Sequence, residues 1–255
     1  MRRLFLFAAV LAAAACNSAK PPEKKAAAVE PPKPVEYFHV DPATAGTIHG
    51  RITYTGAKPE RKVIDMDSDA ACQKAHAGHP VYDESLVTGK SGGLANAFVY
   101  IQSGLEGKKF EPAEASVVLN QHGCMFQPRV FGIRAGQTMA VRNSDTVSHN
   151  VHPKPTNNYD WNQQQSPGAP DLEHRFPRAD VMIPVKCNVH SWMRAFIGVV
   201  DHPYFAVTGL DGSFQLKNVP PGDYTLAVWQ EKLGEQKQTV HLAPSGTAAV
   251  NFTYP

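Results

Sequence analysis

The stretch "CNVHSWM" places a thiol, an imidazole and a thioether close together, at Cys187, His190 and Met193. Sulfur and imidazole nitrogen are ligands suited to copper, whereas magnesium and calcium ions prefer oxygen. Two histidines and one cysteine in a trigonal arrangement, with a weak axial methionine, form the blue-copper site that transfers single electrons. Such a site needs one more histidine, which a distant strand must supply.

A second stretch, "SHNVH", supplies two candidates, His149 and His152. His149 follows "VRNSD" at the end of an expected strand, where its side chain can point to one end of a β sandwich. The two histidines are three positions apart, so in a strand they face opposite ways and only one should reach the site. We expect His149 to bind the metal and His152 to face solvent, with His152 as the alternative ligand. The sequence thus predicts one mononuclear copper ion held by His149, Cys187, His190 and Met193.

Each of these residue types taken alone has a simpler interpretation. A single cysteine is more often a buried thiol, a single methionine is usually core filler, and a single histidine is more often a surface or satisfied core residue. The spacing, together with the upstream "HNV", favours copper. In "CQKAHAGH", Cys72, His76 and His79 could bind a second metal, but a disulfide in a polar loop explains the cysteine better. The other histidines considered, all expected at the surface, are His122, His174, His202 and His241.

Short runs of β-forming residues must position these side chains, because helical periodicity is almost absent. The runs are broken by Gly, Pro, Asn and Asp, which is typical of an all-β sandwich. The polar segment 154–175 is expected to be a long mobile loop, and 71–78 one helical turn. Strands are predicted at 47–56, 95–104, 115–123, 129–145, 180–187, 195–202, 212–222, 223–231, 237–246 and 248–254.

The chain begins with "MRRLFLFAAVLAAAAC", in which two arginines precede an apolar run that is too short to span a bilayer stably. This order predicts a secretory signal peptide over 1–16. The junction "AAAC" resembles a bacterial lipobox, which implies lipidation of Cys16, with plain secretion as the alternative. Residues 17–37, rich in proline and lysine, are expected to form a semi-rigid tether. We therefore expect export and a lipid anchor in a bacterial membrane, facing the periplasm or the cell surface.

Four cysteines are present, and lipidation of Cys16 leaves Cys72, Cys124 and Cys187 in an oxidising compartment. Three is an odd number, so at least one of them is unpaired. We expect a disulfide between Cys72 and Cys124, with Cys187 free. The chain has neither CxxCH, which would indicate covalent haem, nor a CxxC pair for dithiol chemistry.

The charge of the chain argues against several classes of function. A net charge of +2 is too small to indicate nucleic-acid binding, and the basic residues are scattered. No GxSxG, HExxH or phosphate-binding loop occurs. Acidic residues in expected turns have no nearby nucleophile. We therefore expect a protein that is not an enzyme.

The segments "RNSDTVSHNV" and "CNVHSWM" are similar to the pattern of cupredoxins of the plastocyanin/amicyanin type, over residues 115–202. In that family a strand ends in Asn shortly before His-Asn-Val, and Cys-x-x-His follows with Met close behind. The short spacing between His190 and Met193 is typical of amicyanins. The resemblance implies a Greek-key β sandwich and the same four copper ligands. It also implies that Asn150 hydrogen-bonds toward the Cys187 loop, and that His190 lies at the surface, where electrons pass.

The stretch "GSFQLKNVPPGDYTLAV" resembles the carboxypeptidase regulatory-like, or transthyretin-like, β sandwich, whose pattern is Gly-x-Phe followed by Pro-Pro-Gly-x-Tyr. "TIHGRITYTGAKP" and "GLANAFVYIQ" are similar to the first strands of that family. The resemblance implies a sandwich split between 38–114 and 203–255, with the cupredoxin domain inserted at 115–202. It implies a structural or binding module without carboxypeptidase activity.

Together these features predict an exported blue-copper protein that carries single electrons and meets a periplasmic or surface redox protein through transient contacts. Two alternatives use the same residues differently. One is a lipoprotein that delivers or sequesters copper, and the other is a surface binding or structural module with a degenerate copper site. The optical spectrum separates them, because a copper–thiolate bond is strongly coloured.

Overall fold

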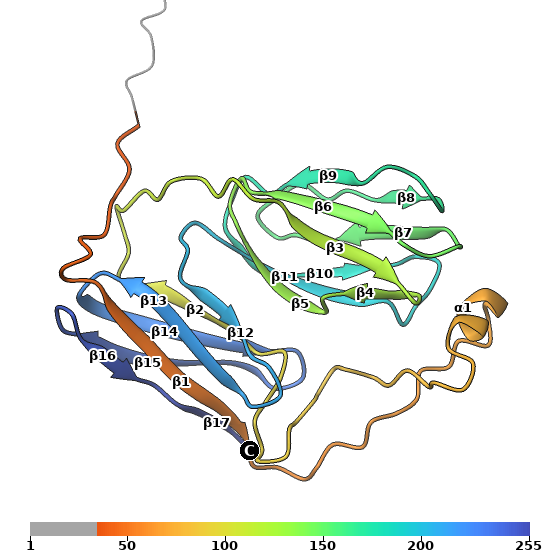
Figure 1. Ribbon diagram of the computed structural model, residues 1–255, viewed down its shortest axis with the longest axis horizontal. Helices are drawn as coiled ribbons and strands as arrows, with labels where there is room; N and C mark the ends of the chain where they lie inside the picture. The colour runs from red at the N-terminus through yellow and green to blue at the C-terminus, as the bar shows by residue number, and fades with distance from the viewer. Residues whose placement is uncertain (1–34) are drawn as a thin grey trace, which may run out of the picture. The chain divides into compact units, whose positions relative to one another are not determined.

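The computed structural model describes residues 35–255, which form seventeen β strands and one short helix (Figure 1). The all-β prediction is therefore confirmed. The signal peptide, Cys16 and residues 17–34 of the expected tether lie outside the described residues. Within the described part of the chain, no helix is long and apolar enough to cross a bilayer. The elements are β1 Gly46–Tyr54, α1 Ala70–Ala75, β2 Phe98–Ser103, β3 Val117–His122, β4 Met125–Gln127, β5 Val130–Arg134, β6 Thr138–Asn143, β7 His149–Pro153, β8 Gln163–Gln165, β9 Leu172–Arg175, β10 Asp180–Lys186, β11 Arg194–Val200, β12 Phe205–Val207, β13 Ser213–Val219, β14 Gly222–Gln230, β15 Gly234–Leu242, β16 Thr247–Ala249 and β17 Phe252–Tyr254.

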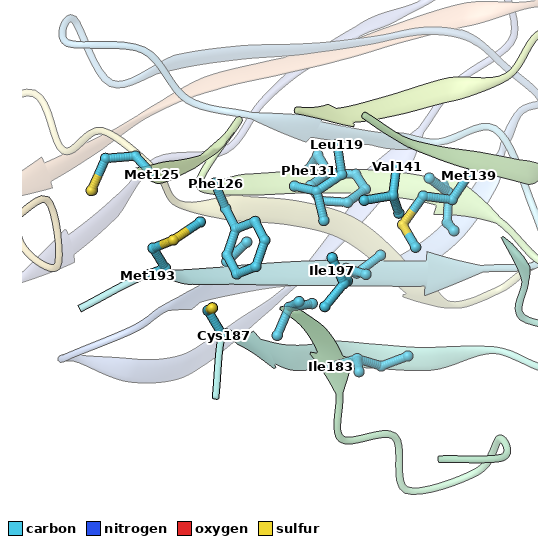
Figure 2. Close-up of a cluster of buried hydrophobic side chains, with 14 of the residues drawn as sticks. Leu119, Met125, Phe126, Phe131, Met139, Val141, Ile183, Cys187, Met193 and Ile197 are labelled. Atoms are coloured by element: carbon cyan, nitrogen blue, oxygen red, sulfur yellow. The ribbon is translucent and has the colours of Figure 1, made fainter. Parts of the chain in front are cut away.

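Strands β3 to β11 form two sheets, which enclose one core. One sheet has the strand order β4-β3-β6-β9, and the other has the order β5-β11-β10-β7-β8. Leu119 from β3, Phe126 from β4 and Ile197 from β11 belong to the same buried cluster (Figure 2). Side chains alternate between the two faces of a strand, so each of these strands can bury one face in this core.

The remaining strands form a second pair of sheets. One has the order β13-β1-β16, with β17 also paired to β1, and the other has the order β12-β2-β14-β15. Alternate residues of β14, namely Tyr224, Leu226 and Val228, are buried in a cluster that also contains Ile52. The Tyr224 hydroxyl donates a hydrogen bond to the carbonyl of Pro220 at 2.6 Å, which ties β14 to the "PPG" reversal before it.

The two pairs of sheets meet at a contact that we call the seam, made by Phe98, Phe205, Gly132 and Gly198. The two glycines are register partners in the parallel strands β5 and β11. The rings of Phe98 and Phe205 stack with their centroids 5.8 Å apart and lie against these glycines. A Cβ atom at position 198 would lie 2.2 Å from the Phe98 ring, so glycine is what allows the ring to come this close.

Two segments differ from the sequence expectation. Segment 129–145 is divided into β5 and β6, because a turn that contains Gly136, at φ +79°, separates the two strands. Segment 154–175 is more ordered than a bare loop, since it contains β8 and β9. The backbone N–H of Thr156 donates to the carboxylate of Asp180 at 2.8 Å, which anchors the start of this segment to β10.

Candidate metal centre

Three strands bring the ligand candidates to one end of the five-stranded sheet. His149 is the first residue of β7, and Cys187 directly follows β10, which pairs antiparallel with β7. Strand β10 also pairs with β11, and the turn between them carries His190 and Met193. The Cys187 backbone N–H donates to the Met193 carbonyl at 3.3 Å and closes this turn.

The side-chain donor atoms of His149, Cys187 and His190 converge. The two Nδ1 atoms are 3.0 Å apart, and the Cys187 Sγ is 3.9 Å from the His190 Nδ1. One donor atom from each of the three residues lies within 4.8 Å of the others. The exposed fractions of the three residues are 0%, 4% and 2%, so a metal ion held by them would be shielded from water.

A carboxylate holds the outer nitrogen of each histidine. The His149 Nε2 lies 2.8 Å from the Asp145 Oδ2, and the His190 Nε2 lies 3.2 Å from the Asp69 Oδ2. A protonated Nε2 that donates to a carboxylate leaves the lone pair on Nδ1, and it also fixes the orientation of the ring. When a metal ion binds, both Nδ1 atoms can therefore offer a lone pair to the same point.

The thiol of Cys187 is unpaired and sits among hydrogen-bond donors. Its Sγ accepts the backbone N–H of Asn150 at 3.3 Å and that of His190 at 3.4 Å. Burial raises the pKa of this thiol, but the hydrogen bonds from His149 and from the backbone outweigh burial and lower the pKa to about 6. A thiolate is the form that binds metal.

His149 is the charge partner of this thiolate. Burial lowers the pKa of His149, but the hydrogen bonds and charges of Asp145 and Cys187 outweigh burial and raise the pKa to about 9. The pKa of Asp145 is lowered, because burial is outweighed by hydrogen bonds with His149 and with backbone N–H groups. Near neutral pH the metal-free site therefore holds a positive imidazolium beside a negative sulfur, and a bound cation would replace the proton on His149.

Met193 lies in the same buried cluster as Cys187. Figure 2 shows their side chains together with Phe126 at one end of this core. The Met193 backbone N–H donates to the His190 carbonyl at 3.1 Å, so the thioether is carried by the same tight turn as two of the other candidates.

Asn150 ties the two ligand-bearing segments together. Its side-chain Oδ1 accepts the backbone N–H of Asn188 at 3.1 Å, one residue after Cys187. Its own backbone N–H donates to the Cys187 Sγ. The residue therefore makes the contact toward the Cys187 loop that the family resemblance implies.

The surface position expected for His190 is wrong. The segment 65–76, which we call the cap and which contains α1, covers the outer side of the imidazole. The Asp69 carboxylate contacts His190 and also accepts the backbone N–H of Cys72 at 3.0 Å at the start of α1. A disulfide between Cys72 and Cys124, the pairing expected from the sequence, joins the cap to the turn between β3 and β4.

His152 does not face solvent as expected. It is buried, with Nδ1 3.1 Å from the Asn188 Oδ1 and Nε2 3.1 Å from the Asp160 Oδ1. Among residues 35–255, the clusters of potential metal ligands include His149 but not His152.

The other histidines considered do not belong to a cluster of potential metal ligands among residues 35–255. His122 and His241 are exposed, and His174 is half-buried. The surface position expected for His202 is wrong, because this residue is buried with its Nε2 2.8 Å from the carbonyl of Ile101. Neither His76 nor His79 belongs to a potential metal cluster within the described part of the chain.

Sequence reasoning missed the two carboxylates. Asp145 stands four positions before His149 in "DTVSH", a spacing that could have indicated it. Asp69 comes from a segment 121 positions away from His190, and only the fold brings the two together. Trp192, whose ring centroid lies 5.1 Å from that of His190, was also not considered.

The donor set fits a copper ion. Two imidazole nitrogens and a thiolate sulfur, with a thioether on the same turn, are ligand types that copper prefers. The carboxylates of Asp69 and Asp145 face the outer nitrogens, so they orient the histidines and leave the centre to nitrogen and sulfur.

One family model matches part of the chain. It is described as polysaccharide lyase family 4, domain II, and it matches residues 178–250, from just before β10 to just after β16. No curated protein matches the chain.

Several solved structures are similar to part of this chain. A copper-containing nitrite reductase from Thermus scotoductus SA-01 is 19% identical over 39% of this chain, with a TM-score of 0.32, and the match spans 25% of that chain. A purple cupredoxin from Nitrosopumilus maritimus is 21% identical over 34% of this chain and 99% of its own, with a TM-score of 0.28. A mutant of amicyanin in its reduced state is 19% identical over 40% of this chain and 97% of its own, with a TM-score of 0.30.

Proposed function

We propose that this chain is an exported protein that binds a single copper ion through His149, Cys187 and His190, with Met193 as a weak axial ligand, and carries single electrons. The observation that carries the proposal is the convergence of two Nδ1 atoms and one Sγ in a buried site, with each Nε2 held by a carboxylate. Copper bound here would supply one-electron chemistry between its Cu(II) and Cu(I) states.

The role of the chain is to hold its ligands in one geometry. Paired strands fix His149 and Cys187, and Asn150 links their loops. The hydrogen bonds of Asp145 and Asp69 stop the imidazoles from rotating. A site that rearranges little when its charge changes exchanges electrons quickly, which is the property that an electron carrier needs.

The proposal extends to the setting of the protein. We place it on the outside of a bacterial membrane, held by a lipid on Cys16 and the tether that follows, and we propose that a periplasmic or surface redox protein is its transient partner. We propose that the chain carries electrons without turning over a substrate of its own.

Optical and EPR spectra of the protein loaded with Cu(II) test the proposal. We expect a strong visible band from the copper–thiolate bond and its loss in Cys187→Ser, because a serine hydroxyl cannot supply thiolate charge transfer. Val189→Ala, in the exposed part of the same turn, is the matched control and should keep the band. A colourless wild-type protein that takes up no Cu(II) would refute the proposal and favour a binding module. A coloured protein that is slowly reduced and readily gives copper to a chelator would favour copper delivery.

A further inference from the structure

Trp192 connects the candidate metal centre to the protein surface. Its indole packs against the His190 imidazole, with ring centroids 5.1 Å apart. Its Nε1–H donates to the carbonyl of Cys124 at 3.0 Å, which fixes the ring. Since the cap buries His190, a partner can touch the half-buried indole but not the imidazole behind it.

The exposed part of Trp192 lines a surface pocket of about 500 Å³. Three exposed cationic side chains, Lys62, Arg194 and Lys232, line the same pocket. None of the three forms an ion pair with another residue of 35–255. Their charges are therefore available to a partner.

The acidic residues of the pocket are already engaged by donors of the chain itself. The Glu231 carboxylate accepts two hydrogen bonds from the Arg129 guanidinium, at 2.7 and 3.0 Å. Asp83 accepts the backbone N–H of Ser85 at 2.7 Å, and Asp65 accepts a backbone N–H within its own turn at 2.9 Å. The pocket is therefore lined by four cationic and three acidic side chains, of which Arg129 and Glu231 pair with each other, and it carries a net positive charge beside an aromatic ring that touches a metal-ligand candidate.

We propose that Trp192 and this pocket form the docking surface for a redox protein that presents acidic side chains, and that electrons pass between that partner and the centre through Trp192. The inference rests on the proposed function and names the partner and the route. Each transfer moves one electron, so the partner loses or gains one while the centre gains or loses one, and no bond forms or breaks.

The first test uses metal-free protein and the fluorescence of Trp192, isolated as the difference between wild type and Trp192→Phe. Free cations near the indole attract anions, so the ratio of quenching by iodide to quenching by caesium should be several-fold higher for Trp192 than for a free indole in the same buffer. The double variant Lys62→Glu, Lys232→Glu should lower this ratio to the value of the free indole or below it. Lys217→Glu, an exposed position on β13 outside the pocket, is the matched control and should leave the ratio unchanged. Quenching with no preference for iodide beyond that of a free indole, or quenching that is unchanged in the double variant, would overturn the cationic docking surface.

The second test uses copper-loaded, reduced protein and two soluble c-type cytochromes of similar potential, one acidic and one basic. We expect faster electron exchange with the acidic cytochrome and a loss of about tenfold in the Lys62→Glu, Lys232→Glu variant, since steering by a few charges changes association rates by this order. Trp192→Leu should slow exchange with the visible band unchanged, and Trp192→Phe should retain more of the rate. If Trp192→Leu alters the band, the comparison of wild type with Trp192→Phe decides the route. Faster electron exchange with the basic cytochrome would overturn the inference. Exchange rates that change neither in the Lys62→Glu, Lys232→Glu variant nor in the Trp192 variants would also overturn it.

The two failures can be told apart. If the wild type shows no copper–thiolate band, the proposed function fails. The quenching measurement, which uses metal-free protein, still tests whether the pocket attracts anions. If the band is present and electrons are exchanged but the pocket variants behave as wild type, only the inference about Trp192 fails.

Discussion

At the scale of single residues, the candidate centre is organised by contacts between carboxylates and imidazoles. Asp145 holds one imidazole and Asp69 holds the other, each through Nε2. The charge of Asp145 raises the pKa of His149, and the proton on His149 in turn lowers the pKa of Cys187. These interactions favour the thiolate form of the buried Cys187.

The Asp145→Asn substitution tests, in the metal-free protein, whether Asp145 sets the pKa of His149 and thereby that of Cys187. Asparagine keeps a hydrogen-bond acceptor but loses the negative charge, so His149 should lose its proton at a lower pH. Without the imidazolium, the Cys187 thiolate loses a stabilising partner, and its pKa should rise from about 6 toward the ordinary thiol value, by roughly one pH unit. A pH titration of the ultraviolet thiolate absorbance measures this. Asp160→Asn, beside His152, is the control and should leave the titration where it is.

Met193 tests the weakest of the four proposed bonds. An axial thioether contributes little to holding the metal but tunes its potential. Met193→Gln should therefore leave copper bound while shifting the reduction potential and the visible spectrum. Voltammetry and a copper assay on the same sample measure both. Complete loss of copper would mean that Met193 is a principal ligand or that the fully buried site cannot accept an amide.

At the scale of elements, the cap is what distinguishes this centre from one with an exposed histidine. The helix α1 is short, and two contacts hold it in place: the Asp69 carboxylate at His190 and the disulfide from Cys72 to Cys124. Asp69 serves both the helix and the histidine, because its Oδ1 accepts backbone N–H groups of α1 while its Oδ2 faces His190. A change that loosens the cap should therefore also expose the centre to solvent.

Removing the disulfide tests this coupling. In the double variant Cys72→Ala, Cys124→Ala, the free energy of unfolding should fall by about 2–4 kcal/mol, because the unfolded chain gains freedom. The cap should also open more often, so copper should pass to a chelator faster than in wild type. Urea unfolding and the rate of loss of the visible band measure the two effects. Lys74→Ala, an exposed change in α1, should alter neither; unchanged chelator rates in the cysteine variant would show that the cap does not control access.

The elements also show which features can be predicted from sequence. Strand β13 alternates buried Phe214 and Leu216 with exposed neighbours, so the strand and its buried face can be predicted from the sequence. In β7 every residue is buried, which is why His152 was wrongly expected to face solvent: other chain segments cover the strand on both faces. Cys187, His190 and Met193 could be recognised because their spacing is local, and His149 because Asn-Val follows it directly. The cap could not, since the contact between Asp69 and His190 spans 121 positions and depends on the completed fold.

At the scale of the whole described chain, the two pairs of sheets are held together by the seam and by one buried ion pair. Arg129, at the start of β5, contacts Glu231, which follows β14, at 2.7 Å, and both side chains are largely buried. These two residues also line the pocket beside Trp192. The proposed docking surface therefore depends on the seam, because residues from both pairs of sheets build it.

Gly198→Ala tests the seam. The added methyl group would lie 2.2 Å from the Phe98 ring, and Phe98 is fully buried, so the ring or the strands must shift. Overpacking of this kind costs about 1–3 kcal/mol, and chemical denaturation should show a loss of that order. In Gly209→Ala the new Cβ meets nothing nearer than 3.8 Å, so that variant should be as stable as wild type or slightly more stable. The visible band should survive in both variants, because the seam lies in a separate buried cluster from the candidate ligands. If Gly198→Ala proves no less stable than Gly209→Ala, the close approach of Phe98 to Gly198 does not hold the sheets together.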